Sequence, residues 1–363
     1  MKPVAVHLVA GARPNFMKIA PLFHALARED WCRPAIVHTG QHYDANMSDA
    51  FFRDLRLPEP HFRLGAGSGT HAEQTAAVMI GYERLAADER PDWVIVVGDV
   101  NSTAACAMVA AKLWIPVIHL EAGLRSGDRR MPEEINRLVT DAICDVLWTP
   151  SPDADENLAR EGVPAAKIDR VGNIMLDSFE MLRATIAAGG TRAAFGLQPG
   201  GYGVVTLHRP SNVDRREDLE PLVAQLAAVA RELPLVFPVH PRTRQQLAAF
   251  GLLAALPGVL ITEPLGYTQF MNLVCDARAV ITDSGGVQEE STYLGIPCLT
   301  LRENTERPIT VTSGTNRLVR TAELYERVCD ALAGRWPTGR RPELWDGQTA
   351  GRCVAALRRR AAA

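Results

Sequence analysis

The chain has 363 residues, of which 47% are hydrophobic and 22% are charged, as in an ordinary globular protein. Its 39 Lys and Arg against 42 Asp and Glu give a net charge of −3, so we expect neither nucleic acid nor an anionic membrane surface as a partner. A chain of this length exceeds one ordinary hydrophobic core, which predicts two domains.

The sequence also argues against a membrane segment and a disulfide or zinc framework. No apolar run approaches the roughly 18 residues that a membrane span needs. The seven cysteines are scattered without a Cys-x-x-Cys pair. This usage suits a reducing cytoplasm, so we expect no disulfide and no bound metal.

The first half of the chain begins with two predicted strands, each leading into a candidate binding loop. The strand Val4–Ala10 is followed by Gly11 and then by a helix that Pro14 suits at its first turn. A glycine turn before a helix N-terminus can bind an anion, and Arg13 and Lys18 would add positive charge there. The plain alternative is a βα loop with surface bases.

A second predicted strand, residues 35–39, leads into the polar and aromatic segment 40–44, another candidate pocket edge. The glycine-rich segment 65–70 follows, but it lacks the position in a first βα unit that a dinucleotide loop needs. We interpret it as a loop before a helix over residues 71–90.

Residues 93–137 are the predicted centre of the protein. Two β-branched runs, residues 94–97 and 115–120, predict buried parallel strands joined by an Ala-rich crossover helix. Asp99 follows the first strand, Glu121 follows the second, and Glu133 opens the next helix. Because the carboxyl ends of parallel strands share one crevice, we expect the three acids to converge on one site.

Convergent carboxylates repel one another, which would raise the pKa of at least one of them and suit it for proton transfer near neutral pH. The alternative is that these acids only cap helices. Glu121 fits that alternative least well, because the Ala-Gly-Leu-Arg that follows it is a poor helix start.

The second half repeats the alternation of strand and helix. Gly and Pro are dense in residues 173–200, which predicts the interdomain linker there and domains at residues 1–173 and 174–349. Five further strands are predicted at residues 203–207, 235–239, 259–262, 279–282 and 297–301. The fold class is therefore α/β with two doubly wound parallel sheets.

Three strand ends of the second half carry polar chemistry. His208 and His240 each follow a strand, and a turn of Ser284, Gly285 and Gly286 begins a helix, where backbone N–H groups can reach a phosphate. Glu290 lies one turn into that helix and could accept the two hydroxyls of a ribose. The alternatives are an exposed first-turn acid for Glu290 and a buried, satisfied histidine for His208.

Six ordered motifs together resemble the non-hydrolysing UDP-N-acetylglucosamine 2-epimerases. They are Gly11-Ala-Arg-Pro, Gly98-Asp99, His119-Leu-Glu121-Ala-Gly-Leu-Arg125, Pro132-Glu133-Glu134-Ile-Asn-Arg137, Asp283-Ser-Gly-Gly-Val-Gln-Glu-Glu290 and Thr305-Glu-Arg-Pro308. The resemblance implies the glycosyltransferase-B architecture: two Rossmann-like domains facing a cleft, with a C-terminal helix at about residues 350–363 that packs back on the first.

The resemblance also implies a reaction. The family interconverts UDP-GlcNAc and UDP-ManNAc by eliminating UDP to a 2-acetamidoglucal and adding it back, which supplies ManNAc-derived units for surface polysaccharide. It needs neither NAD nor a metal. A homodimer in the cytoplasm, with a UDP-sugar as substrate, is what the resemblance leads us to expect.

Site residues are carried over by matching motifs. The implied catalytic set is Asp99, Glu121, Glu133 and His208. The implied UDP-sugar-binding set is Arg13, Lys18, Arg137, His240, Ser284, Gly285, Gly286, Glu290 and Arg307. Gln41 and His42 match an allosteric substrate site of some relatives. Asn15 departs from the family, because many relatives have Glu there.

Several other functions stay open at this point. A 2-epimerase of a modified sugar, such as UDP-2,3-diacetamido-glucuronate, would share all these motifs, since contacts to the sugar C3 and C6 cannot be identified. A hydrolysing epimerase, a glycosyltransferase of the same fold and a non-catalytic nucleotide-sugar sensor are further alternatives. An NAD-dependent epimerase is disfavoured, because the chain has neither Gly-x-Gly-x-x-Gly nor Tyr-x-x-x-Lys.

Overall fold

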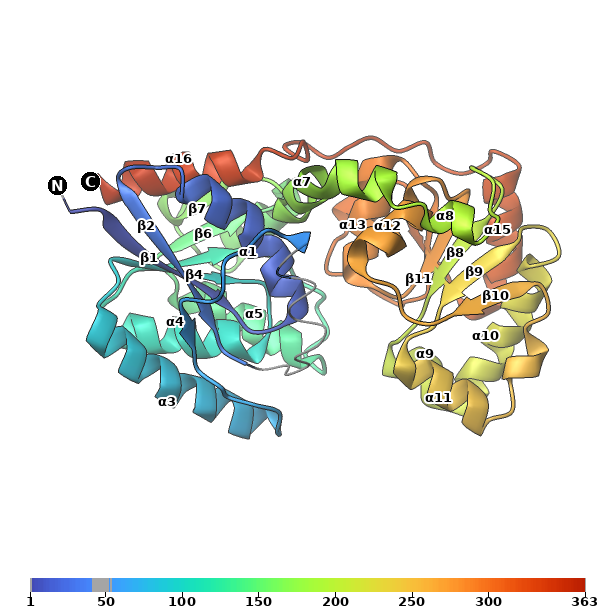
Figure 1. Ribbon diagram of the computed structural model, residues 1–363, viewed down its shortest axis with the longest axis horizontal. Helices are drawn as coiled ribbons and strands as arrows, with labels where there is room; N and C mark the ends of the chain where they lie inside the picture. The colour runs from blue at the N-terminus through green and yellow to red at the C-terminus, as the bar shows by residue number, and fades with distance from the viewer. Residues whose placement is uncertain (1, 41–51, 53, 363) are drawn as a thin grey trace. The chain divides into compact units, whose positions relative to one another are not determined.

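The computed structural model describes residues 2–40, 52 and 54–362. The chain divides into two compact units (Figure 1). Unit 1 comprises Met1–Leu182 and Glu343–Ala363, and unit 2 comprises Arg183–Pro342. Each unit is a parallel sheet with helices, as the alternation of strands and helices predicted.

Unit 1 is built on a seven-stranded sheet in the order β3-β2-β1-β4-β5-β6-β7, with every neighbouring pair parallel. Its strands are β1 (Val4–Ala10), β2 (Cys32–His38), β3 (Phe62–Arg63), β4 (Trp93–Val97), β5 (Val117–Leu120), β6 (Val146–Thr149) and β7 (Ile168–Arg170). The strand order reverses between β1 and β4. This switch point is where doubly wound sheets bind ligands.

The helices of unit 1 cover both faces of its sheet (Figure 1). They are α1 (Arg13–Leu26), α3 (His71–Glu89), α4 (Asn101–Lys112), α5 (Pro132–Ile143), α6 (Pro152–Arg160), most of α7 (Ile174–Ala188) and α16 (Thr349–Ala361), with a 3-10 turn at Ala165–Lys167. Helices α3 and α4 pack against each other, as do α1 and α16. Apolar side chains of β4, α3 and α4 fill the core between them, among them Val94, Tyr82 and Cys106.

The C-terminal segment returns to unit 1 through specific contacts. The backbone N–H groups of Thr349 and Ala350 donate to the Asp177 carboxylate at 2.9 and 3.0 Å. The indole of Trp345 donates to the carbonyl oxygen of Pro150 at 3.0 Å. A buried carboxylate thus satisfies the first N–H groups of α16 and fixes where the helix begins.

The unit boundary lies within helix α7, whereas the sequence placed it at residue 173. Residues 174–188 are one continuous helix, and the division falls between Leu182 and Arg183. The first turns of α7 belong to unit 1 because Ser178 donates to the carbonyl oxygen of Met17 and Asp177 holds α16. Glycine and proline density marks only the chain after the helix, where Gly190 has a positive φ.

Unit 2 is a six-stranded parallel sheet in the order β10-β9-β8-β11-β12-β13. Its strands are β8 (Gly203–Thr206), β9 (Leu235–Pro238), β10 (Val259–Thr262), β11 (Ala279–Thr282), β12 (Cys298–Thr300) and β13 (Asn316–Leu318). Its helices are α8 (Thr191–Ala194), α9 (Pro210–Val213), α10 (Arg216–Val229), α11 (Pro241–Ala249), α12 (Tyr267–Cys275), α13 (Gly285–Leu294), α14 (Ile309–Thr312) and α15 (Leu324–Leu332), with 3-10 turns at Leu253–Ala255 and Thr321–Glu323. The switch point lies between β8 and β11.

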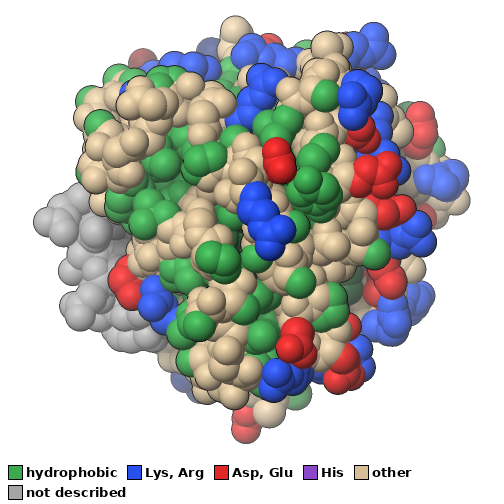
Figure 2. Space-filling view, turned by 90° about the vertical axis from the view of Figure 1, so that its right-hand side faces the viewer, with side chains coloured by type: hydrophobic (Ala, Val, Ile, Leu, Met, Phe, Trp, Pro, Cys, Tyr) green, Lys and Arg blue, Asp and Glu red, His purple; other side chains and the backbone are tan. Residues whose placement is uncertain are grey.

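Charged side chains of both signs lie close together on the surface. On the right of Figure 2, acidic and basic side chains alternate over the visible face. Ion pairs between neighbouring residues also occur in unit 2, where Arg327 and Arg335 both pair with Asp330. This mixture agrees with the small net charge of the sequence.

Candidate active site

The switch point of unit 1 brings the loops after β1 and β4 into contact. A Cβ atom on Gly11, after β1, would lie 2.4 Å from the hydroxyl oxygen of Ser102 in α4, so only glycine fits there. Asn15 joins the same loops, because its Oδ1 accepts from the N–H groups of Gly11 and Ala12 at 3.1 and 2.9 Å and its Nδ2 donates to the Val97 carbonyl oxygen at 3.1 Å. The glycine turn was predicted to bind an anion, but the N–H groups of Gly11 and Ala12 in this turn are bonded to Asn15.

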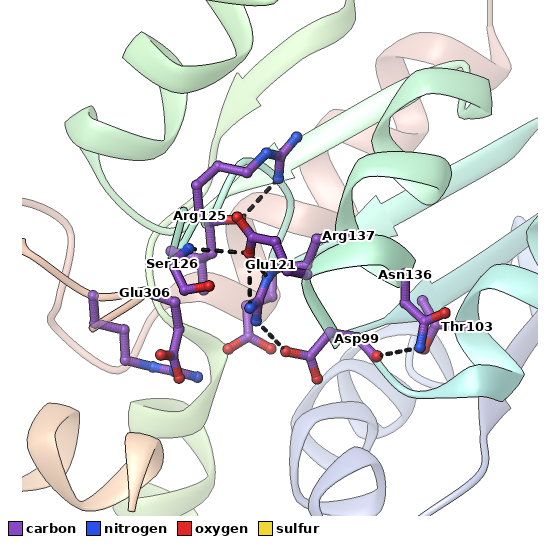
Figure 3. Close-up of polar contacts among 12 residues, drawn as sticks. Asp99, Thr103, Glu121, Arg125, Ser126, Asn136, Arg137 and Glu306 are labelled. Atoms are coloured by element: carbon purple, nitrogen blue, oxygen red, sulfur yellow. Dashed lines mark hydrogen bonds and ion pairs between the residues drawn. The ribbon is translucent and has the colours of Figure 1, made fainter. Parts of the chain in front are cut away.

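Asp99 follows β4 after a left-handed turn at Gly98, whose φ is +68°. The guanidinium of Arg137 donates to Asp99 Oδ2 at 2.5 Å, and Asn136 donates to the Asp99 carbonyl oxygen at 2.9 Å (Figure 3). Helix α4 begins with Val100 as its N-cap and without a side-chain cap, so Asp99 is not a capping residue. The carboxylate of Asp99 is 31% exposed while Arg137 is buried, so a partly exposed carboxylate forms an ion pair with a buried guanidinium.

Glu121 follows β5 in a strained backbone conformation. Its φ is +76°, and its N–H and that of Ala122 both donate to the Trp148 carbonyl oxygen at 3.0 Å. A non-glycine residue with positive φ costs on the order of 1–3 kcal/mol and is characteristic of functional sites. The carboxylate of Glu121 forms a buried ion pair with Lys18. It does not begin a helix, so the capping alternative is wrong for Glu121.

The two acids are therefore each matched by a cation of their own unit. Lys18 and Arg137 were both assigned to the UDP-sugar from the sequence, and the structure places them against Glu121 and Asp99. A Cβ atom on Gly98 would lie 3.0 Å from Lys18 Nζ and 3.4 Å from Glu121 Oε2, which places the acid-bearing loops next to each other. These cations offset the repulsion that we expected between the acids, and a raised pKa at one of them stays a prediction.

Helix α5 presents a buried polar face to these loops, made of Glu134, Arg137 and Asp141. Glu134 accepts from the N–H groups of Ser126 and Gly127 at 3.0 and 2.9 Å and from Arg137 at 2.9 Å. Burial opposes the charge of Glu134, but the two N–H bonds and Arg137 lower its pKa below the usual range.

Glu133, the acid predicted to be catalytic, is exposed in the first turn of α5, as a residue facing solvent or a ligand would be. The buried neighbour Glu134 was not singled out from the sequence. The spacing of residues 134, 137 and 141, at i, i+3 and i+7, is the signal that could have identified the buried face.

In unit 2, Asp283 organises the switch point. Its fully buried carboxylate accepts from the N–H groups of His208 and Arg209 and from the amide of Asn212 at 2.9 to 3.1 Å, and His208 Nδ1 lies 3.0 Å away. Burial opposes the charge, yet the bonds from His208, Arg209 and Asn212 lower the pKa of Asp283.

His208 is therefore oriented by a carboxylate but is not enclosed. Its side chain is 40% exposed, so the alternative of a buried, satisfied histidine is wrong. Among the residues that the structure describes, nothing bonds its Nε2. The ring of His240 lies 5.7 Å from that of His208, centroid to centroid, and its Nδ1 accepts from the N–H of Arg242 at 3.3 Å. Burial, followed by the charges of His208 and Arg242, lowers the pKa of His240.

The turn before α13 has the predicted form. Ser284 is the N-cap of the helix, and Gly285 and Gly286 are its first residues. A Cβ atom on Gly285 would lie 2.7 Å from Arg307 Nη1, whereas one on Gly286 would meet nothing within 4 Å. The backbone is thus closely packed at Gly285 and open at Gly286, where a ligand could approach the helix N-terminus.

Arg307, assigned to UDP from the sequence, is held by two carboxylates beneath this turn. Its Nε lies 2.9 Å from Glu289 Oε1 and its Nη1 pairs with Glu306, which also pairs with Arg302 at 2.8 Å. Burial opposes the charge of Glu306, but Arg307 and Arg302 lower its pKa. A phosphate contact from Arg307 stays a prediction.

Glu290 is buried rather than exposed, so the alternative of an exposed first-turn acid is wrong. Tyr267 of α12 donates to Glu290 Oε1 at 2.8 Å. Burial raises the pKa of Glu290 to about 8, against the opposing effect of the Tyr267 bond. A carboxyl group of this kind can exchange a hydrogen bond partner for a sugar hydroxyl.

Three predicted residues cannot be placed. Gln41 and His42 lie outside the described residues, and so does the side chain of Arg13. Within the described part of the chain, no group of three or more His, Cys, Asp or Glu side chains is arranged to hold a metal ion. No helix in this part of the chain is long and apolar enough to cross a membrane.

Comparison with known proteins identifies relatives that match most of this chain. Residues 24–358 match a family model described as UDP-N-acetylglucosamine 2-epimerase. A UDP-N-acetylglucosamine 2-epimerase of Methanocaldococcus jannaschii is 44% identical, with 86% of this chain and 87% of the relative covered. A UDP-2,3-diacetamido-2,3-dideoxy-D-glucuronate 2-epimerase of Pseudomonas aeruginosa is 42% identical, with 86% and 88% covered.

Solved structures agree with these relatives. The Methanocaldococcus jannaschii UDP-GlcNAc 2-epimerase in complex with UDP-GlcNAc and UDP has a TM-score of 0.88 and 41% identity, with 98% of this chain and 99% of that chain covered. A lipopolysaccharide outer core galactosyltransferase of 11% identity has a TM-score of 0.56, which is a likeness of fold alone.

Proposed function

The chain belongs to the UDP-N-acetylglucosamine 2-epimerase family, and from this premise we propose that it interconverts UDP-GlcNAc and UDP-ManNAc without net hydrolysis. The observation that carries the proposal is the pair of acids at the unit 1 switch point. Asp99 and Glu121 lie in adjacent loops, and each forms an ion pair with a buried cation of its own, Arg137 and Lys18 respectively. The chain that holds them is 44% identical to an epimerase. Proton transfer at a sugar carbon needs such groups.

The chemistry explains why more than one acid is required. The C2 hydrogen of UDP-GlcNAc is not acidic, because no carbonyl group is adjacent to it. In the proposed elimination, the C1–O bond breaks and its electron pair leaves with UDP, while a carboxylate takes the C2 proton and a C1=C2 double bond forms. A proton then returns to the opposite face of C2, and UDP adds back to C1. Because the proton is removed from one face of C2 and returned to the other, the reaction needs two acid–base groups.

Unit 2 offers groups suited to the leaving UDP. Negative charge builds up on the diphosphate as the C1–O bond breaks, and N–H dipoles or cations lower the energy of that charge. The open backbone at Gly286 and the oriented, half-exposed His208 supply candidates. Glu290 is our candidate for the ribose. Glu133, His240, Arg13 and Arg307 complete the set that we propose from the family motifs.

Three further proposals accompany this function. The elimination–addition route requires neither nicotinamide nor a metal ion, so we propose that the enzyme works without a cofactor. The seven cysteines are unpaired in the described residues, which fits the cytoplasmic location that we propose. A homodimer follows from the resemblance alone, and light scattering in solution would test it.

One alternative substrate class has a specific observation in its favour. The Pseudomonas aeruginosa relative, whose name gives a diacetamido-glucuronate as its sugar, is 42% identical, close to the 44% of the archaeal UDP-GlcNAc enzyme. Overall similarity therefore does not separate the two sugars. Both reactions invert C2 of a UDP-sugar and would use the same acids.

A proton NMR time course in heavy water tests the proposal directly. The protein is incubated with UDP-GlcNAc, and we expect UDP-ManNAc to form with deuterium at C2 and little free UDP. Free ManNAc together with UDP would instead indicate a hydrolysing enzyme. If UDP-GlcNAc is unchanged while UDP-2,3-diacetamido-glucuronate is epimerised, the alternative sugar replaces the proposed one.

A further inference from the structure

A buried chain of polar groups in unit 1 connects the two acid-bearing loops, and its central residue was not assigned a role from the sequence. His119 in β5 is fully buried. Its Nε2 lies 2.8 Å from the carbonyl oxygen of Gly98, which directly precedes Asp99, and its Nδ1 lies 2.6 Å from Asp141 Oδ1 in α5. His119 thus bridges the β4 loop and helix α5.

The other oxygen of Asp141 holds the second loop. Asp141 Oδ2 accepts from the N–H of Gly123 at 3.0 Å and pairs with Arg125 Nη1 at 2.7 Å. Arg125 in turn forms two bonds to Glu161, at 2.8 and 2.7 Å. Gly123 lies two residues after Glu121 and has a φ of +81°, and a Cβ on it would lie 2.5 Å from the Ala154 carbonyl oxygen.

The hydrogen bonds fix the protons on the imidazole ring. The Gly98 carbonyl oxygen can only accept, so Nε2 carries a hydrogen. Asp141 accepts from Gly123 and Arg125 and is therefore ionised, which requires a second hydrogen on Nδ1. Burial opposes the charge of Asp141, but His119 and Arg125 lower its pKa, in agreement with this assignment. His119 consequently donates from both nitrogens, and neither is available to a substrate.

We propose that His119 and Asp141 are positioning residues, which hold the Gly98-Asp99 turn and the Glu121–Gly123 turn in the one geometry that epimerisation requires. The inference rests on the proposed function for the reaction, but its geometry stands on the contacts alone. Reacting groups displaced by about 1 Å can lose on the order of 100-fold in rate. The backbone at Glu121 has a positive φ angle, which is unfavourable for a residue other than glycine, so it needs such external restraints.

Two substitutions of the same residue separate its two bonds. In His119→Gln the side-chain amide can occupy the place of Nε2 and still donate to Gly98. In His119→Asn it can occupy the place of Nδ1, so the bond to Asp141 is kept and the bond to Gly98 is lost. Both variants remove one hydrogen bond of a buried ring, so their losses of stability should be similar.

We expect kcat of His119→Asn to fall on the order of 100-fold, with KM and UDP affinity unchanged, while His119→Gln stays within about tenfold of the parent chain. Equal losses of kcat in the two variants, following their losses of stability, would assign His119 a purely structural role. A loss of kcat/KM that comes entirely from a higher KM would also assign His119 a purely structural role.

A second measurement does not depend on turnover. In the parent chain we expect a far-downfield imidazole proton in the NMR spectrum, from the short Nδ1–H bond to Asp141, and we expect Asp141→Asn to abolish it. The backbone amide resonance of Asp99 should shift in His119→Asn and stay in place in His119→Gln. An Asp99 resonance unmoved in both variants overturns the positioning role, whereas absence of turnover in the parent chain overturns only the proposed function.

Discussion

At the scale of single residues, the candidate site depends on backbone conformations that most side chains avoid. Gly98 and Glu121 both have positive φ angles and end the two strands that carry the acids. Glycine adopts this conformation freely, but for Glu121 it is unfavourable. Two N–H bonds to Trp148, the pair with Lys18 and the network around Asp141 hold it in place.

Gly98→Ala tests whether this local geometry matters for activity. Gly162→Ala is the matched control, because Gly162 also has positive φ but a Cβ there would meet nothing within 4 Å. Both substitutions should lower the free energy of unfolding by about 1 kcal/mol through the unfavourable φ alone. Only Gly98→Ala introduces a methyl group against Lys18 and Glu121, so only this variant should lose epimerase activity, by tenfold or more in kcat. Equal activity in the two variants would contradict it.

At the scale of elements, two helices bury carboxylates with opposite results. In α5, N–H groups and Arg137 lower the pKa of Glu134. In α13, Glu290 has Tyr267 as its bonded partner, and burial raises its pKa to about 8. Each helix therefore presents a carboxyl group of a different kind: one is an anion that fixes loops, and the other retains its proton until the pH is above neutral.

The raised pKa of Glu290 predicts a specific pH dependence of stability. Between its ordinary pKa of 4.5 and about 8, the unfolded chain releases the proton of Glu290 while the folded chain retains it. The folded state therefore loses stability as the pH rises through this window, by at most about 1.4 kcal/mol per pH unit.

Glu290→Gln removes the titrating group and should become more stable than the parent chain as the pH rises from 5 toward 8. Thermal unfolding at steps of pH measures the difference between the two. Glu303→Gln, at an exposed glutamate of the same unit, is the control and should track the parent chain. If the stability of Glu290→Gln instead follows that of the parent chain at every pH, the carboxyl group of Glu290 is ionised in the folded protein.

At the scale of the whole molecule, the sequence predicted both parallel sheets and the strand ends that carry polar side chains. It missed β3 and β13, which are edge strands of two and three residues with no apolar run to reveal them. It also assigned Lys18 and Arg137 to the UDP-sugar, which stays a prediction. The type of a residue shows that its side chain is charged but not which group that side chain faces. Only the fold shows that Lys18 pairs with Glu121 and Arg137 with Asp99.

The division into units leads to a prediction about the separate steps of function. Asp99 and Glu121 belong to unit 1, whereas Ser284, Gly286 and Glu290, our candidates for binding UDP, belong to unit 2. Asp99→Asn and Glu121→Gln preserve shape and remove a charge. We expect UDP affinity within about threefold of the parent chain and a fall in kcat on the order of 1,000-fold, because general acid–base groups contribute roughly 100- to 10,000-fold.

Titration calorimetry with UDP and the heavy-water NMR assay measure the two quantities. Glu156→Gln, at an exposed acid of unit 1, is the control for the change of charge and should retain both properties. Running the NMR assay from UDP-GlcNAc and from UDP-ManNAc adds a further distinction. A variant that still exchanges the C2 hydrogen of one epimer has kept the acid that serves that face. Loss of UDP affinity as large as the loss of kcat, with unfolding temperatures unchanged, would make these acids binding groups and remove them from proton transfer.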